Sequence, residues 1–148
     1  VSEDLLDRPA LYLSDFFNRN RATYYDSLTM VRKSSDLTQW IKFFLSGIIE
    51  SSKDSRKTFE QIVHLRASCE KRIATLGKRS PKALELLHYL FKRPTVDYKD
   101  VQECLELTHP AVNNMIQEFV RIKMLHEITG GKKNRLFEFS DYLNIFRK

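Results

Sequence analysis

Glycine and proline are so scarce in this sequence that most of the chain is expected to be helical. The 148 residues contain four of each. Most of them fall around Gly77 and Pro81, at Pro94 and Pro110, and at Gly130 and Gly131. Because these two residues are the strongest interruptions of regular structure, the stretches between them predict a mainly α fold. One helix is expected from Thr38 to Thr75, unless the polar run 51–57 interrupts it, with Gly77 as its stop.

Composition limits the size and the class of the protein. With 42% hydrophobic and 30% charged residues, the chain suits one or two small globular domains. The net charge of +6 and the pI near 9.4 permit binding to nucleic acid or another acidic surface without proving it. Cys69 and Cys104 are the only cysteines, so we expect buried thiols rather than a disulfide framework. The first residues, VSEDLLDRP, form neither a signal peptide nor a membrane span, and a cytoplasmic fragment with no membrane contact is expected.

The second half of the chain has the pattern of a winged helix-turn-helix domain. Pro81 fits the first turn of a helix that ends before Pro94, with Ser80 as its cap, and Asp97 can cap a second helix. A third helix begins near Thr108, with apolar residues at the spacing of a buried face. The period then changes to two short strands, at residues 125–129 and 136–139, around a basic loop. Three helices followed by a β-hairpin predict this fold. We expect domains at residues 1–76 and 77–148.

The same pattern provides candidate contact residues. The third helix has a polar stripe at i, i+4 spacing, where a winged helix would read a DNA major groove. The loop after Gly131 would be the wing, with cations that phosphates could contact. The candidates for nucleic-acid or partner contact are His109, Asn113, Asn114, Gln117, Arg121, Lys132, Lys133 and Arg135. The outer side of any helix is polar, however, so docking of a protein remains an equal reading.

Catalytic chemistry is not expected from these residues. Neither GxxxxGK[ST] nor GxGxxG is present. The four histidines are scattered, and none has a neighbour at metal-ligand spacing. We therefore predict no catalytic, cofactor-binding or metal-binding residue in the chain itself.

Two segments identify a family resemblance. LYLSDFFNRNRATYYDSLTMVR, residues 11–32, resembles the pattern LYLSxxFxxNRxxYYxxLxxVR that follows the catalytic loop in Fic family proteins. DLTQWIKFFLSGIIE, residues 36–50, resembles DWxxWxxFFLxGV in the next helix, with Leu37 where a tryptophan is common. The resemblance continues through GKRSPKALELLHYLF and TGGKKNRLFEFSDYLNIF, which are similar to the winged helix appended to many such proteins.

The resemblance implies what the complete protein does. Fic enzymes transfer AMP from ATP to a hydroxyl side chain of a target protein, and use the motif HPFxxGNGRxxR and a divalent cation. That motif is not in these residues and would lie upstream of Val1. The chain is thus expected to be the C-terminal helices of a Fic domain, a long connecting helix and a winged helix. ATP and Mg²⁺ are implied for the full-length protein only.

An inhibitory motif of the family, [ST]xxxE[GN], is matched in part. Ser46 to Glu50 fit its first five positions, but Ser51 stands where glycine or asparagine is required. The mechanism of inhibition therefore stays open.

Three hypotheses follow for the role of the chain. The first is a non-catalytic module of a Fic-type adenylyltransferase whose winged helix docks a target or a partner. The second is a DNA-binding transcriptional regulator. The third is a homodimer held by the long helix or by the winged helix. The sequence does not name the modified protein or a DNA site.

Overall fold

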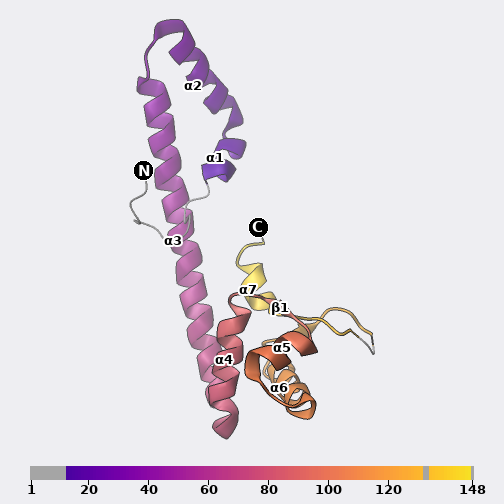
Figure 1. Cartoon of the computed structure of the whole chain (residues 1–148). Helices are drawn as coiled ribbons and strands as arrows, with labels where there is room; N and C mark the ends of the chain where they lie inside the picture. The colour runs from indigo at the N-terminus through magenta and orange to yellow at the C-terminus, as the bar shows by residue number, and fades with distance from the viewer. Residues whose placement is uncertain (1–12, 132–133, 148) are drawn as a thin grey trace. The chain divides into compact units, whose positions relative to one another are not determined.

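The structure, a computed structural model, describes residues 13–131 and 134–147 and is mainly helical with a small antiparallel sheet (Figure 1). The chain packs as two compact units, residues 1–60 and 61–148. The boundary expected after residue 76 lies just past the end of the long helix, whereas the two compact units divide within that helix, because its last turns pack in the core of the second unit. No helix among the described residues combines the length and the apolar content needed to cross a bilayer.

The first unit contains α1 (Leu13–Arg19), α2 (Arg21–Ser34) and the beginning of α3 (Thr38–Ala74). Helices α1 and α2 are separated at Asn20, which has a φ of −110° and a ψ of 33°. The side-chain amide of Asn20 donates to the carbonyl oxygen of Phe16 at 3.0 Å. The backbone N–H of Asn20 donates to the same oxygen at 3.0 Å, so the interruption is a local change in φ and ψ, and α2 begins with the next residue.

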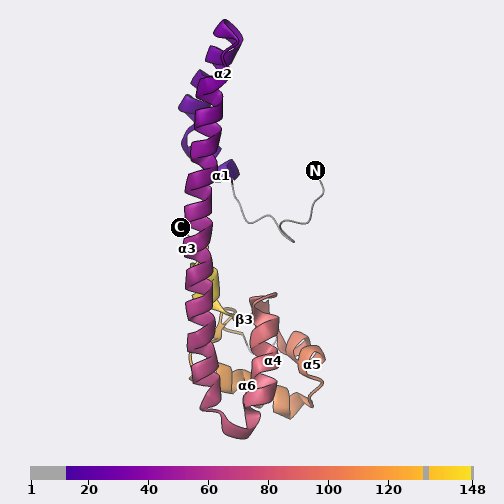
Figure 2. The same ribbon diagram turned by 90° about the vertical axis from the view of Figure 1, so that its left-hand side faces the viewer.

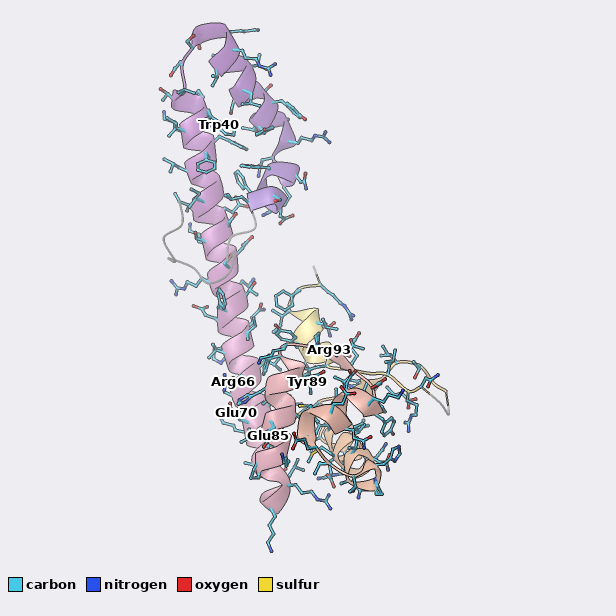
Figure 3. The ribbon with its side chains drawn as sticks, viewed as in Figure 1. Trp40, Arg66, Glu70, Glu85, Tyr89 and Arg93 are labelled. Carbon is cyan, nitrogen blue, oxygen red and sulfur yellow. The ribbon has the colours of Figure 1, made fainter. Side chains whose placement is uncertain are left out.

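Aromatic rings form the core of the first unit. Phe17 stacks on Tyr24 at 5.5 Å and on Phe43 at 5.8 Å between ring centroids. Trp40, labelled in Figure 3, lies on α3. Its ring meets that of Tyr24 edge to face with 5.6 Å between centroids. The rings of Phe17 and Tyr24 are half-buried, and the most deeply buried ring of this unit is that of Phe16. Phe16, Phe17 and Tyr24 are thus structural, whereas the neighbouring ring of Tyr25 is 52% exposed.

The long helix α3 is continuous over 37 residues, so the run 51–57 does not interrupt it. It ends at Ala74, one residue before the expected end. Gly77 follows with a φ of 58°, in the left-handed region that favours glycine. The expected stop at this glycine is therefore confirmed, and a short 3-10 helix, η1 (Gly77–Arg79), leads into α4.

The second unit is a winged helix-turn-helix. Its helices are α4 (Ser80–Leu90), α5 (Tyr98–Leu105) and α6 (His109–Arg121), and a short α7 (Ser140–Asn144) closes the chain. The strands β1 (Thr95–Val96), β2 (His126–Glu127) and β3 (Phe137–Glu138) form an antiparallel sheet in the order β1-β3-β2. The expected hairpin is β2 and β3. Pairing of β1 with β3 was not expected, because two residues carry no period.

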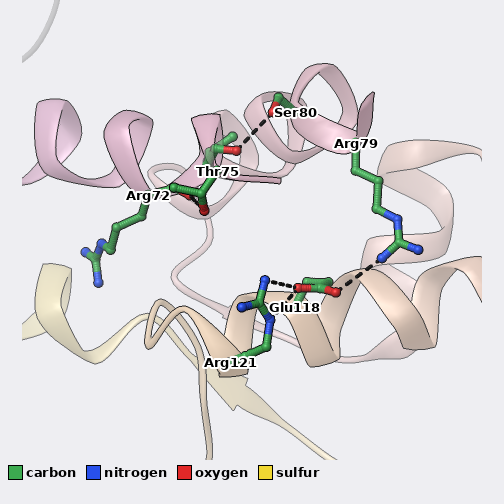
Figure 4. A network of polar contacts seen from close by, with 7 residues as sticks. Arg72, Thr75, Arg79, Ser80, Glu118 and Arg121 are labelled. Carbon is green, nitrogen blue, oxygen red and sulfur yellow. Dashed lines mark hydrogen bonds and ion pairs between the residues drawn. The ribbon is translucent and has the colours of Figure 1, made fainter. Parts of the chain in front are cut away.

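Two predicted helix starts have different outcomes. Asp97 caps α5 as expected: its carboxylate accepts from the backbone N–H of Asp100 at 2.8 Å, and the carboxylate of Asp100 accepts from the N–H of Asp97 at 3.0 Å. This is a complete capping box. Ser80 does not cap α4, because its hydroxyl donates to the carbonyl oxygen of Ile73 at 2.9 Å instead. That bond ties the end of α3 to the start of α4 (Figure 4).

The core of the second unit lies between α4, α5, α6, the sheet and the end of α3. Figure 2 shows α4 beside the last turns of α3, whose Cys69 and Ile73 are buried in this core. The expectation of buried thiols is confirmed for Cys69, which is fully buried, whereas Cys104 is half-buried; both thiols are free. Burial raises the pKa of each thiol, which makes both less nucleophilic.

Candidate docking and nucleic-acid interface

Helix α6 presents the predicted polar stripe on its outer side. Val112, Ile116 and Phe119 are fully buried, as the apolar spacing predicted. The predicted contact residues on the outer side of α6 differ in how exposed they are. The exposed candidates are His109, Asn114, Gln117 and Arg121, and Asn113 is half-buried.

Tyr98, at the start of α5, brings three of the predicted residues together. Its ring stacks on the imidazole of His109 with 5.9 Å between centroids and 10° between planes. Its hydroxyl donates to Oδ1 of Asn113 at 3.1 Å and accepts from Nη1 of Arg135 at 3.3 Å. Sequence reasoning missed Tyr98, because nothing local marks a tyrosine in a first helical turn as a contact of another helix.

Arg135 is engaged by a carboxylate rather than free for phosphate. Its Nε donates to Oε1 of Glu127 at 2.8 Å, and its Nη2 donates to Oε2 of the same residue. The guanidinium also lies 5.2 Å from the ring centroid of Phe137. The hydrogen bond from Arg135 lowers the pKa of Glu127, and the bond to Glu127 raises the pKa of Arg135. A phosphate would have to displace a charge-assisted pair with two bonds.

Arg121 is held in a similar way. Glu118, three residues earlier on α6, accepts from Nε of Arg121 at 2.7 Å through Oε2. The other oxygen of Glu118 accepts from Nη1 of Arg79 at 3.2 Å, so one carboxylate lies between two arginines (Figure 4). Both arginines that belong to the predicted contact set and lie among the described residues thus have a carboxylate partner.

The tip of the wing is described only at its two ends. Lys132 and Lys133, the other predicted cations, lie outside the described residues. Gly130 and Asn134, on either side of them, have φ values of 62° and 51°. These left-handed conformations are typical of a tight loop, in the place expected for the wing.

A second surface lies on α3 in the first unit and is apolar. Four aliphatic side chains at four-residue steps are each about half exposed, from 50% to 56% of their area. They are Leu37, directly before α3, and Ile41, Leu45 and Ile49 on α3, and we refer to them as the aliphatic row. The buried residues of the same segment, Phe43 and Gly47, lie on a different side of the helix. Apolar residues therefore occupy most of the helix circumference and leave Gln39, Lys42 and Ser46 as a narrow polar strip.

Glu50 has a local partner next to this surface. Its Oε1 lies 3.0 Å from Nη1 of Arg19 on α1, and the same guanidinium is 3.6 Å from the carboxylate of Asp54. The glutamate of the partial inhibitory motif is thus an ion-pair partner of α1 in this structure.

A comparison with protein-family models found no match for this chain.

Proposed function

We propose that this chain is the non-catalytic C-terminal part of a Fic-type protein adenylyltransferase. The complete protein would transfer AMP from ATP, with Mg²⁺, to a hydroxyl side chain of a target protein. The first unit would pack onto the catalytic core, and the winged helix would dock the target, a partner or a second copy. The resemblance of residues 11–32 and 36–50 to the Fic patterns supports this assignment.

The observation that best supports the proposal is the aliphatic row on α3. A helix at the surface of a small protein has one apolar side toward the core and a polar side toward water. Between residues 37 and 49, α3 has an apolar side toward α1 and α2 and a second, half-exposed one. A helix with two apolar sides is suited to the interior of a larger domain. We infer that the catalytic core of the complete protein covers the second apolar side.

The surface charges of the winged helix favour a protein partner over DNA. DNA affinity depends largely on cations that neutralise phosphates. Arg121 and Arg135 each have a carboxylate in contact, so the described part of the predicted face offers less positive charge than its sequence suggests. Amide and imidazole side chains remain exposed, and these suit hydrogen bonds to a protein surface.

A direct test is the coding sequence upstream of Val1. The proposal expects HPFxxGNGRxxR there, within one open reading frame with this chain. It also expects purified residues 1–148 to transfer no AMP from labelled ATP to protein. An upstream sequence without the motif, or AMP transfer by the chain alone, would contradict the proposal.

DNA binding is a second candidate, favoured by the exposed amides of Asn114 and Gln117 on α6. Such groups can read base edges in a major groove. This candidate expects duplex binding that weakens steeply with salt, with a smaller slope when Lys132 and Lys133 are changed to alanine. No duplex binding at low salt would exclude it.

A further inference from the structure

We propose that the hollow between the start of α4 and helix α6 is a docking site for a short acidic and apolar segment of a partner protein. The hollow has a volume of about 280 Å³. Its lining residues are Lys78, Arg79, Lys82, Leu107, Ala111, Asn114 and Met115. The inference rests on the docking role proposed above, and it adds the place of the contact and the chemistry of the partner.

The rim of the hollow is basic and partly fixed in place. Arg79 is held by Glu118 at 3.2 Å, and Lys82 donates to Glu85 at 2.8 Å. Lys78 is exposed and has no ion pair among the described residues. A ligand carboxylate can therefore meet Lys78 without breaking a pair, and it can share the remaining donors of Arg79.

The floor of the hollow is apolar. Leu107 and Ala111 are half-buried, and Met115 is 4% exposed. Methionine is an adaptable surface for an apolar side chain, and the exposed amide of Asn114 in the same lining can orient a peptide backbone. Cations around an apolar floor select a segment in which an apolar side chain lies next to a carboxylate.

Nucleic acid fits this surface less well. A phosphate could contact Lys78, but a sugar-phosphate backbone has no group that gains from burial against Leu107 and Met115. Arg79 and Lys82 already have carboxylate partners, Glu118 and Glu85. The two glutamates would repel a polyanion, whereas a ligand with a single carboxylate could bind at a distance from them. The hollow therefore favours a peptide with few charges over a duplex.

The test uses residues 1–148 and a fluorescent peptide in which two leucines are flanked by glutamates. Peptide binding is measured by anisotropy, and the same peptide with serines for the leucines and a duplex of random sequence are competitors. The charge variant is Lys78→Glu with Lys82→Glu. Its matched control is Lys92→Glu with Lys99→Glu, which makes the same change at two exposed lysines of this unit outside the hollow. Circular dichroism verifies that each variant is folded.

A filling variant separates shape from charge. Ala111→Arg places a long side chain in the hollow and adds a positive charge. We expect it to weaken peptide binding although attraction by charge alone would rise. The charge variant should weaken binding about tenfold, on the scale of two to three exposed ion pairs, and the control should leave it within about twofold. The serine peptide and the duplex should compete poorly.

Three results would overturn the inference: no peptide binding, equal loss in the charge variant and its control, or displacement of the peptide by the duplex. The peptide-binding test and the test of the proposed function can fail independently of each other. AMP transfer by the full-length protein without peptide binding would remove only the hollow as a docking site. Peptide binding without AMP transfer would remove only the assignment to a Fic-type enzyme.

Discussion

Arg135 and Glu127 face each other across the base of the wing, with Nε and Nη2 of the arginine donating to the two carboxylate oxygens of the glutamate. Nη1 of Arg135 continues to the hydroxyl of Tyr98, which in turn donates to Asn113 on α6. One cation thus links the hairpin, α5 and α6. Its role in this structure is to position the wing against the helices.

The pair predicts a pH-dependent stability. The pKa of Glu127 is lowered from its ordinary value of 4.5 by the bonds from Arg135. A lowered folded pKa gives stability that is present above the unfolded pKa and is lost as the pH falls through the folded pKa. The Tm of wild type should exceed that of Glu127→Gln at neutral pH, and the difference should vanish in acid. Glu103→Gln, at an exposed glutamate without an ion pair among the described residues, is the matched control and should leave the Tm at neutral pH close to that of wild type.

Gly47 allows α1 to approach α3 closely. A Cβ at this position would lie 2.7 Å from Cδ1 and 2.8 Å from Cε1 of Phe16, whose ring is buried. Overpacking of this kind costs about 1–3 kcal/mol, whereas alanine in a helix gains about 1 kcal/mol over glycine. We expect Gly47→Ala to destabilise the first unit by up to about 2 kcal/mol in urea unfolding. Ser46→Ala, at the exposed neighbouring position, is the control and should not destabilise it.

A second change tests whether Phe16 is the cause. In the background Phe16→Leu, which shortens the side chain at the contact, Gly47→Ala should lose most of its cost. An equal cost in both backgrounds would show that the close approach does not determine the need for glycine.

The capping box of α5 predicts a modest and local loss. Asp97→Ala removes the acceptor for the N–H of Asp100, and loss of a cap of this kind costs about 0.5–2 kcal/mol. Asp97→Asn keeps an acceptor oxygen and should recover most of the stability. Thermal unfolding of both variants measures this. An Asp97→Ala protein as stable as wild type would mean that the cap adds nothing to the fold.

The aliphatic row predicts that two neighbouring surfaces of α3 respond differently. Ile41→Lys with Leu45→Lys changes exposed side chains, so the stability of the chain should change by no more than about 0.5 kcal/mol per site. Phe43→Ala, at a ring that is 8% exposed, should cost about 3–5 kcal/mol. Urea unfolding compares them. A loss in the lysine variant as large as that in Phe43→Ala would show that the row is already buried within the chain.

The same lysine variant tests self-association. If the row is uncovered in the isolated chain, residues 1–148 should form dimers at high concentration, and the lysine substitutions should shift them to monomers in analytical ultracentrifugation. A dimer that persists in the variant would place the contact elsewhere, such as on the winged helix.

Local chemistry made much of the fold predictable. The capping residue Asp97, the stop at Gly77 and the buried positions of α6 each depend on neighbours a few residues away, and all are confirmed. Serine is a common N-cap residue, but the hydroxyl of Ser80 donates to a carbonyl oxygen of α3 instead. That choice depends on the packing of α3 against α4, which local sequence does not encode.

The sequence predicted which candidate residues are exposed, but it did not predict which carboxylates pair with the candidate arginines. The i, i+4 stripe gave the outer side of α6, because helical periodicity alone decides it. The partners of Arg121 and Arg135 were not predicted. Glu118 is three residues from Arg121 and could have been found as a helical pair. Glu127 meets Arg135 only through the geometry of the hairpin, and Tyr98 joins them from a third element.

The most direct test of the account is AMP transfer by the full-length gene product that contains this chain. Labelled ATP with Mg²⁺ should yield AMP-modified protein with the full-length product and none with residues 1–148. The full-length product with Ile41→Lys and Leu45→Lys should lose transfer, because under the proposal the catalytic core packs on the aliphatic row. A full-length product that transfers no AMP, or one whose transfer is unaffected by these substitutions, would contradict the account.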